Sequence, residues 1–221
     1  MVDGICVEDM RGRENDFQIE RNGFTILNIN TRLEYHDFFD NKKVLQYFNL
    51  MEEIRKRHPA YPISDGSMYD YDQPTTVAHV DTSREGTMDE IRRQYGKEAD
   101  NLLKKRFQWI NFWKPIRGPV NDWPLALCDS SFIDVAKDLA VSDLLYPDLA
   151  TENSLLYYRE GLKWYYLRDH TPNEILVFKQ MDSLTSSCPA GVPHASFWNP
   201  YASKKEPPRE SIEGRALVFY D

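Results

Sequence analysis

Cysteine and histidine are scarce in this chain of 221 residues, which contains three cysteines and five histidines. Cys6, Cys128 and Cys188 are odd in number, lie far apart and form no CxxC pair. A disulfide framework needs paired cysteines, so none is expected here. This cysteine usage favours a reducing compartment, and we expect a cytoplasmic protein.

Long apolar runs and an excess of basic residues are also absent. No apolar run approaches the roughly 18 residues that a membrane-spanning helix needs. The N-terminal stretch MVDGICVEDMRGRENDF is acidic and has no apolar segment typical of a signal peptide. The net charge is −8, whereas contacts to phosphates require clustered lysine and arginine. We therefore expect neither a membrane nor a nucleic acid as partner, but a small-molecule substrate.

What the chain does contain is enough apolar material for a core. It is 41% hydrophobic and 13% aromatic, which excludes pervasive disorder. Its length is typical of one domain, and no internal repeat or linker divides it. We therefore expect a single domain over residues 1–221, and the sequence leaves its oligomeric state open.

The hydrophobic periodicity predicts many short strands and a few helices. Strands are expected at 24–29, 76–81, 107–113, 125–128, 155–158, 163–167, 175–181, 192–198 and 212–220. Helices are expected at 40–57, from Thr87 to about Lys105, and at 132–139. Residues 159–162 contain a glycine and are typical of a hairpin link between the flanking strands. Such a pattern indicates a mainly β sandwich or barrel, with a helix-rich part over about 1–105 packed on its outside.

The first candidate site is His79-Val80-Asp81, which lies in a predicted strand. Alternate side chains of a strand share a face, so His79 and Asp81 point to the same side. Two such ligands suit one edge of a metal site. An HxD triplet alone is also compatible with a purely structural polar pair.

The third candidate ligand is His194, on another predicted strand, where it shares a face with Ser196 and Trp198. His170 competes with it, although His170 lies at a predicted turn. A zinc site through Cys188 and His194 is a further alternative, but closed zinc sites need four ligands and no partner pair is present. Trp113 and Trp198 are the aromatic residues best placed to line a pocket.

Two imidazoles and one carboxylate on one face of Fe(II) form a triad that leaves three coordination positions open. A 2-oxo acid can occupy two of them and O₂ the third. The far carboxylate of the 2-oxo acid then needs an arginine, which binds a carboxylate through two parallel hydrogen bonds. Arg209 and, two residues later, Ser211 suit this role. Arg215 is in the same alternation phase and is the fallback anchor.

The chain also resembles a known family through several stretches. These are EDMRGRENDFQIERNGFTIL, HVDTS, INFWKPIRGPVNDWPLALCD, KWYYLRDHTPNEILVFKQMDS, PHASFWNP and PRESIEGRALVFYD. They look like the fungal and bacterial hydroxylase/desaturase family, which is related to the cephalosporin 7α-methoxylase subunit and to gibberellin-desaturase-like proteins. The resemblance covers nearly the whole chain.

The resemblance implies a double-stranded β-helix (jelly-roll or cupin-like) core with flanking helices. It implies Fe(II), 2-oxoglutarate and O₂, with His79, Asp81 and His194 as iron ligands and catalytic centre, and with Arg209 and Ser211 as 2-oxoglutarate anchors. Members hydroxylate, desaturate or close rings, including aziridines, on amino acids or natural-product intermediates of secondary metabolism. Two alternatives stay open: an iron-dependent oxidase or isomerase that does not use 2-oxoglutarate, and a non-catalytic barrel that binds small molecules.

Overall fold

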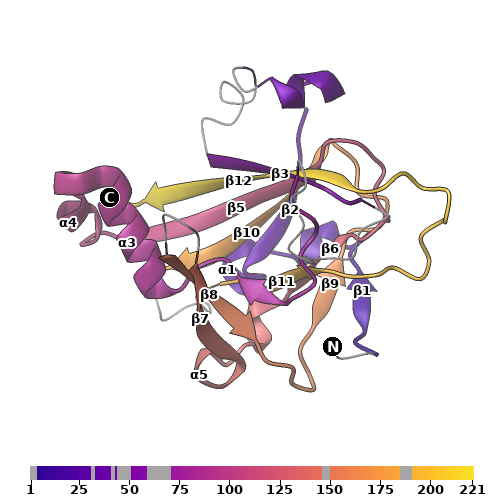
Figure 1. The fold of residues 1–221 in the computed structure, drawn as a ribbon. Helices are drawn as coiled ribbons and strands as arrows, with labels where there is room; N and C mark the ends of the chain where they lie inside the picture. The colour runs from indigo at the N-terminus through magenta and orange to yellow at the C-terminus, as the bar shows by residue number, and fades with distance from the viewer. Residues whose placement is uncertain are drawn as a thin grey trace.

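Two β-sheets and a few short helices make up the chain in the computed structural model, which describes residues 4–30, 33–40, 43, 51–58, 71–145, 150–184 and 191–221 (Figure 1). The strands are β1 (Val7–Asp9), β2 (Phe24–Asn28), β3 (Met51–Lys56), β4 (His79–Val80), β5 (Phe107–Pro115), β6 (Leu125–Cys128), β7 (Leu139–Leu145), β8 (Ala150–Leu156), β9 (Trp164–Tyr166), β10 (Glu174–Asp182), β11 (His194–Ser196) and β12 (Glu210–Phe219). The helices are η1 (Glu14–Asp16), α1 (Ile19–Asn22), η2 (Tyr35–Phe39), α3 (Arg84–Tyr95), η3 (Gly96–Glu98), α4 (Ala99–Leu102), η4 (Ser130–Phe132) and α5 (Val135–Asp138). The expected mainly β architecture is confirmed.

The two sheets differ in the length of their strands. The five-stranded sheet has the order β2-β10-β5-β12-β3 and contains the long strands β5, β10 and β12, which run side by side in Figure 1. The seven-stranded sheet has the order β1-β9-β6-β11-β4-β8-β7, and several of its strands have only two or three residues. Within the described residues every strand pair is antiparallel except β1 with β9.

The main core lies between the two sheets. It combines buried apolar residues from both, namely Phe24, Trp113, Leu176 and Phe178 of the five-stranded sheet with Leu125, Leu127 and Tyr165 of the seven-stranded sheet. Each of these strands therefore turns one face inward, as in a double-stranded β-helix. Burial of this apolar area is the main term that stabilises the fold.

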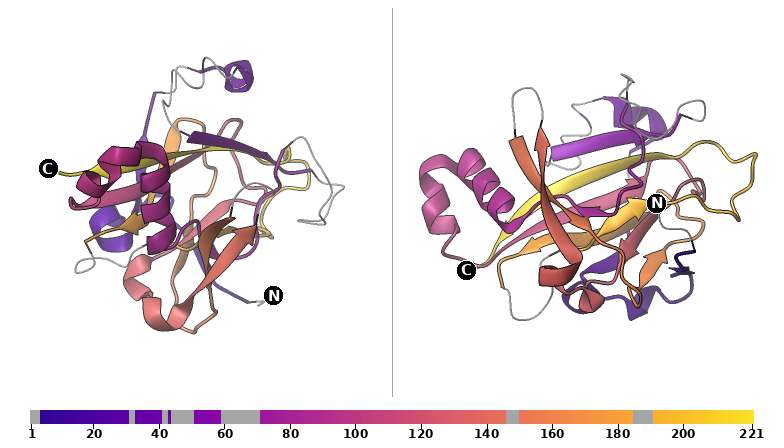
Figure 2. Two further views of the ribbon diagram at one scale, coloured as in Figure 1. Left: turned by 60° about the vertical axis from the view of Figure 1, so that its left-hand side comes forward. Right: turned by 60° about the horizontal axis from the view of Figure 1, so that its bottom comes forward.

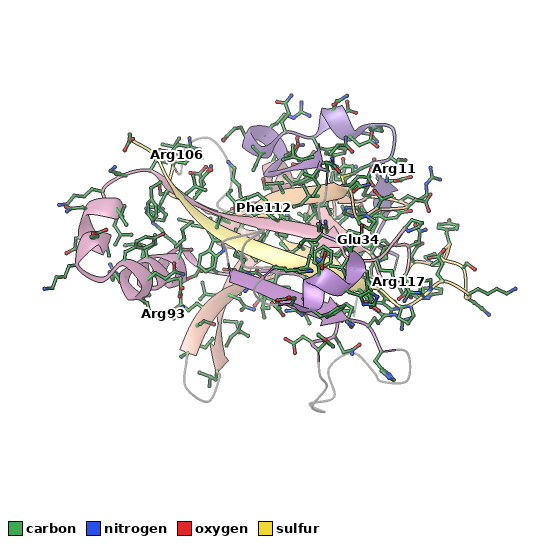
Figure 3. All side chains as sticks on the ribbon, turned by 90° about the horizontal axis from the view of Figure 1, so that it is seen from above. Arg11, Glu34, Arg93, Arg106, Phe112 and Arg117 are labelled. Carbon is green, nitrogen blue, oxygen red and sulfur yellow. The ribbon has the colours of Figure 1, made fainter. Side chains whose placement is uncertain are left out.

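Helices α3 and α4 close one end of the sheets, next to the C-terminus (Figure 2). Helix α3 begins earlier than the expected Thr87, because Ser83 is its N-cap and accepts a hydrogen bond from the Gly86 amide at 2.9 Å. Thr87 lies inside the helix and is buried. Figure 3 shows Arg93 on the outer side of this end, where its charge stays solvated.

The helix expected at 40–57 is wrong over Met51–Lys56, whereas Lys43, near its expected start, is helical. Residues Met51–Lys56 form β3, which pairs with β12 in a register that sets Ile54 opposite Ile212. Ile54 packs in an apolar cluster with Phe38, while its neighbours Glu53 and Arg55 form an ion pair. Strand pairing overrides the helical spacing here, and residues 41–42 and 44–50 of the expected helix lie outside the described residues.

The expected hairpin across residues 159–162 is also wrong. The strand before this link, β8, pairs with β4 and β7, whereas β9 pairs with β6 and β1. Arg159 donates to the Asp138 carboxylate at 2.8 and 2.9 Å and so ties the link to α5. The chain thus leaves β8 and joins the sheet again at β9, three strands beyond β4, as in a jelly roll.

His170 is buried in the turn that precedes β10. Only 2% of its surface is exposed, its Nε2 lies 3.0 Å from the Glu174 carbonyl oxygen, and its ring centroid lies 5.3 Å from that of Trp113. Burial lowers the pKa of His170 from 6.5 to about 4. The imidazole is therefore neutral in the folded protein at pH values where the unfolded chain already binds a proton.

We predict that His170 makes the protein less stable as the pH falls from about 6.5 to about 4. In that window the unfolded state binds the extra proton, so the free energy of unfolding falls by about 3 kcal/mol in all and then levels off. Urea unfolding at several pH values measures the slope. His170→Asn should flatten it, while His36→Asn, at an exposed histidine, should leave it unchanged. An equal slope in wild type and His170→Asn would contradict the prediction.

Candidate functional site

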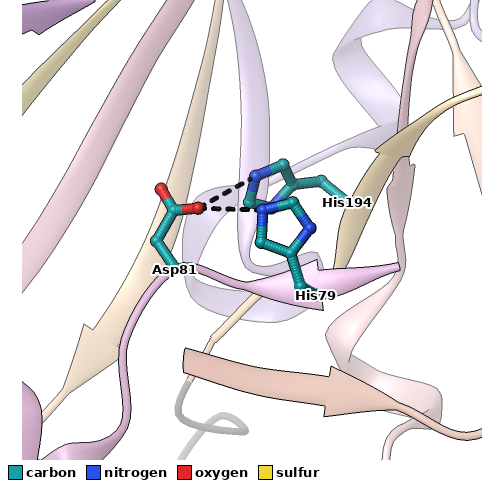
Figure 4. A group of neighbouring side chains, drawn as sticks. All are labelled: His79, Asp81 and His194. Atoms are coloured by element: carbon teal, nitrogen blue, oxygen red, sulfur yellow. Dashed lines mark ion pairs between the residues drawn. The ribbon is translucent and has the colours of Figure 1, made fainter. Parts of the chain in front are cut away.

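Two very short strands bring the predicted metal ligands together. In the register of β4 and β11, His79 lies directly opposite His194. Strand β4 is held on its other side by β8, and β11 by β6. Asp81 follows β4 directly, so its side chain lies on the same side as that of His79 (Figure 4).

The three side chains converge on one point. One ligand atom from each lies within 4.8 Å of the other two. The Asp81 Oδ1 is 3.2 Å from Nε2 of His79 and 3.4 Å from Nε2 of His194, and the ring centroids are 4.5 Å apart. Figure 4 shows both rings turned toward the carboxylate. A carboxylate oxygen and two imidazole nitrogens so arranged can bind one metal ion on one face.

The remaining ring nitrogens fix the orientation of both imidazoles. His79 Nδ1 lies 2.8 Å from the Val77 carbonyl oxygen, and His194 Nδ1 lies 3.2 Å from that of Val192. When Nδ1 donates to a carbonyl, the neutral ring keeps its lone pair on Nε2, which is the nitrogen that faces Asp81. This second bond is usual for metal-binding histidines, so the residues present fit a transition metal ion.

The pKa shifts in the triad favour a negatively charged Asp81 beside a positively charged His194. Burial alone would raise the pKa of Asp81, but His194, His79 and Arg215 outweigh it and hold the pKa well below its usual range. Burial would lower the pKa of His194, but the Asp81 charge outweighs this and raises it.

A partly open cavity lies beside the triad. Its lining comes from several strands and consists of Arg55, Thr75, His79, Asp81, Trp113, Leu125, His194, Ala195, Ser196, Arg209, Glu213 and Arg215. Arg209 precedes β12 and Arg215 follows six residues later, so their backbones lie about 20 Å apart along an extended strand. Because Arg215 contacts Asp81, Arg209 lies at the opposite end of the cavity.

Arg209 is a buried cation without a carboxylate partner among the described residues. Only 2% of its surface is exposed, and its Nη1 donates to Ser196 Oγ at 2.6 Å and to the Trp123 carbonyl at 2.8 Å. Its Nε has no hydrogen-bond partner there. Burial, and then the nearby Arg55, lower the pKa of Arg209 to about 9. A buried charge of this kind is costly unless an anion joins it.

Arg215 is in the opposite situation, because carboxylates surround it. Its Nη2 lies 2.9 Å from Glu213, 3.2 Å from Glu53 and 3.5 Å from Asp81. These neighbours outweigh burial and raise its pKa. Its charge is therefore already balanced by the protein.

The remaining predicted residues have different outcomes. Ser211 is buried on β12 but does not line the cavity, whereas Trp113 does line it, as predicted. Trp198 is 68% exposed, since β11 ends at Ser196. His170 does not approach the triad, and Cys188 lies outside the described residues.

Sequence reasoning missed five polar residues of the site, among them Glu213 in the cavity lining. Arg55 and Thr75 line the cavity and share a hydrogen bond of 3.0 Å, while Asn111 and Gln180 hold Asp81 from outside it. Arg55 was hidden by the wrong helix at 40–57. The alternation of β5 sets Asn111 and Trp113 on one face, but it does not indicate a contact with Asp81.

The chain matches a known protein family over almost its entire length. The model of the family described as "Oxidoreductase/YMDC permease-like domain" matches residues 2–219. Within the described residues, no helix is both long and apolar enough to cross a bilayer.

Several curated fungal proteins are similar in sequence. The Fe(II)/2-oxoglutarate-dependent dioxygenase nvfI of Aspergillus novofumigatus is 35% identical over 150 residues, which cover 67% of this chain and 54% of that protein. The alpha-ketoglutarate-dependent dioxygenase tstK of Talaromyces stipitatus is 29% identical over 98% of this chain and 84% of that protein. The hydroxylase/desaturase efuI of Hormonema carpetanum is 27% identical over 98% of this chain and 83% of that protein.

A solved structure shares the fold. The iron and alpha-ketoglutarate-dependent endoperoxidase NvfI superposes with a TM-score of 0.79 and 25% identity over 96% of this chain and 84% of that protein. The double-stranded β-helix expected from the sequence agrees with this likeness. The chain therefore belongs to this oxidoreductase family, as a member of its hydroxylase/desaturase group of Fe(II)- and 2-oxoglutarate-dependent dioxygenases.

Proposed function

We propose that His79, Asp81 and His194 hold Fe(II), and that Arg209 with Ser211 binds the far carboxylate of 2-oxoglutarate. The observation that carries this proposal is the pairing of two features in one cavity. Three convergent ligand atoms lie at one end, and a buried arginine without a carboxylate partner among the described residues lies at the other. A dianion with a chelating end and a free carboxylate would satisfy both.

The residues of the site divide the work between them. Bound Fe(II) supplies the centre at which O₂ oxidises both the co-substrate and the substrate. His79 and His194 present lone pairs that their carbonyl partners hold in direction, and Asp81 contributes one negative charge. Three ligands leave room for the co-substrate and O₂. Trp113 forms an apolar wall, over which the Arg209 guanidinium lies 5.3 Å from the ring centroid.

Arg209 is a better anchor than Arg215, for reasons of charge. Arg215 would have to leave carboxylates to bind another, while the Arg209 guanidinium forms no ion pair with a carboxylate among the described residues and can accept one from a ligand. Ser196 and Thr75 bring hydroxyl groups to the same cavity, and Ser211 on β12, two residues after Arg209, is the remaining proposed donor.

The substrate is proposed to be an amino acid or a natural-product intermediate of secondary metabolism. Relatives are named as hydroxylase/desaturases, and the structural neighbour is named as an endoperoxidase. Hydroxylation, desaturation and ring closure such as aziridine formation are the proposed outcomes for this chain. The cytoplasmic location stays a prediction, as do the absence of nucleic-acid and membrane partners and the single domain.

The test of this function is anaerobic titration of the purified protein with Fe(II) and 2-oxoglutarate, followed by exposure to O₂. A weak visible charge-transfer band before O₂, and succinate in proportion to 2-oxoglutarate consumed after it, are expected. Turnover of a substrate without succinate would favour the oxidase or isomerase alternative. A protein that binds no divalent metal ion would favour the non-catalytic barrel.

We predict that His79→Ala and Asp81→Ala each weaken metal binding at least about 100-fold, because each removes one of three ligands. Titration of the metal-free protein with Mn(II), followed by electron paramagnetic resonance of the free ion, measures the affinity. His36→Ala, at an exposed histidine on η2, is the control and should bind normally. Wild-type Mn(II) affinity in either variant would contradict the assignment of these residues as metal ligands.

We predict that Arg209→Met raises the 2-oxoglutarate concentration needed for half-maximal succinate formation by about 30-fold to several thousand-fold, the range for loss of a buried charge partner. Mn(II) affinity should stay within a few-fold of wild type. The free energy of unfolding without ligand should not fall, because the change removes a buried charge that lacks a partner among the described residues.

Two comparisons make the arginine assignment decisive. Arg117→Met alters an arginine whose side chain is 54% exposed, and should leave the 2-oxoglutarate requirement unchanged. If Arg215→Met raises that requirement and Arg209→Met does not, Arg215 is the anchor instead.

A further inference from the structure

The two oxygens of the Asp81 carboxylate have different surroundings. Oδ1 faces the two imidazoles, as described above. Oδ2 accepts a hydrogen bond from Asn111 Nδ2 at 2.7 Å and lies 3.5 Å from Arg215 Nη2. One oxygen is thus directed to the ligand cluster, and the other is directed to the protein.

Asn111 reaches Asp81 from the five-stranded sheet. On β5 it lies opposite Phe178 of β10 and opposite Arg215 of β12, and it is completely buried. Phe178 in turn packs its ring 5.0 Å from that of His194. Asn111 therefore occupies the row of the long-stranded sheet that lies next to the triad.

A second amide holds the backbone of the same residue. The Asp81 amide donates to Gln180 Oε1 at 2.6 Å. Gln180 lies at the irregularity of β10 between Lys179 and Met181, where the pairing with β5 shifts. Bulges near functional sites commonly redirect a side chain, and this one directs a buried amide to Asp81.

Both side-chain amides lower the stability of the core in which they are buried. Asn111 Oδ1 and Gln180 Nε2 are buried and have no hydrogen-bond partner among the described residues. A buried amide with half of its polar atoms unmatched destabilises a fold relative to an apolar residue of similar size. In each case the matched half is the one that contacts Asp81, so packing alone does not explain these residues.

We propose that Asn111 is a positioning residue that keeps Asp81 a one-oxygen ligand. The inference rests on the proposed iron site. By engaging Oδ2, Asn111 stops the carboxylate from turning, so that it neither binds the ion through both oxygens nor swings away from it. The coordination position that a second oxygen would take stays open for the co-substrate or O₂. Gln180 fixes the backbone from which this carboxylate projects.

The test compares Asn111→Leu with a matched control, Gln108→Leu. Gln108 lies on the same strand, is buried, and donates through its amide to the Asp182 carboxylate at 2.7 Å, which is not part of the triad. Each change removes one amide–carboxylate hydrogen bond from β5, and Gln108→Leu also removes the bond that Gln108 Oε1 accepts from the Tyr220 hydroxyl at 2.6 Å. Thermal unfolding of the metal-free proteins should therefore show a loss in Gln108→Leu that is at least as large as the loss in Asn111→Leu.

Metal binding should separate the two variants. Asn111→Leu is expected to bind Mn(II) about 10- to 100-fold more weakly than wild type, as is usual when a partner of a metal ligand is lost. The visible absorption of its Co(II) form should also change, because band intensity follows coordination number. Gln108→Leu should match wild type in both measurements. Asn111→Ala replaces the leucine variant if that variant does not fold.

The outcomes distinguish this inference from the proposed function. If wild type binds Mn(II), Asp81→Ala does not, and Asn111→Leu keeps both wild-type affinity and the wild-type Co(II) spectrum, the positioning role is wrong and the triad stands. An equal loss of affinity in Gln108→Leu also overturns it, since the effect would then be general destabilisation. If wild type itself binds no metal ion, the proposed iron site fails.

Discussion

The metal site depends on the register that sets His79 opposite His194. Strands β4 and β11 have two and three residues, too few for their mutual hydrogen bonds to fix this register. Neighbouring strands β8 and β6 fix it from the two sides, and the Ser196 amide donates to the Thr75 carbonyl at 2.7 Å. A slip by one residue would turn one imidazole away from the cavity. The seven-stranded sheet is thus the frame that holds two ligands.

The five-stranded sheet supplies the charges that face this frame. The alternation of extended backbone sets Arg209, directly before β12, on one face with Glu213 and Arg215 of β12, and all three line the cavity. Arg215 lies among carboxylates and is balanced. The Arg209 side chain forms no ion pair with a carboxylate among the described residues, although the Asp122 carboxylate accepts a hydrogen bond from its backbone amide at 2.9 Å. One strand therefore provides both a cation that stabilises the ligand cluster and a cation reserved for an anion. The distance between them is set by the extended backbone.

The sequence was sufficient for features that depend on local spacing. His79 and Asp81 share a side because a strand alternates, and β2, β6, β10 and β12 follow from their apolar and β-branched residues. Features that depend on distant pairing were not predictable in this way. Residues Met51–Lys56 carry apolar spacing that suits a helix, but pairing with β12 makes them a strand. The apparent hairpin at 159–162 failed because both flanking strands pair elsewhere. Asn111 and Gln180 contact Asp81 only through the packing of one sheet on the other, and no spacing in the chain encodes that contact.

The charge of the whole chain bears on how an acidic co-substrate is recognised. A net charge of −8 repels a dianion at long range, so the overall field does not bring it to the site. Recognition must come from short-range contacts in the cavity, where water is displaced and a guanidinium interacts more strongly than at the surface. Arg209 and Arg55 lie close enough that their charges disfavour each other, and Arg209 is buried. A bound dianion offsets both this repulsion and the cost of burying the Arg209 charge. Part of the binding free energy therefore comes from unfavourable electrostatics that the ligand-free protein already contains. The acidic surface disfavours anions that bind only weakly. A dianion that contacts both Arg209 and the metal ligands is held at both ends of the cavity and can overcome this repulsion.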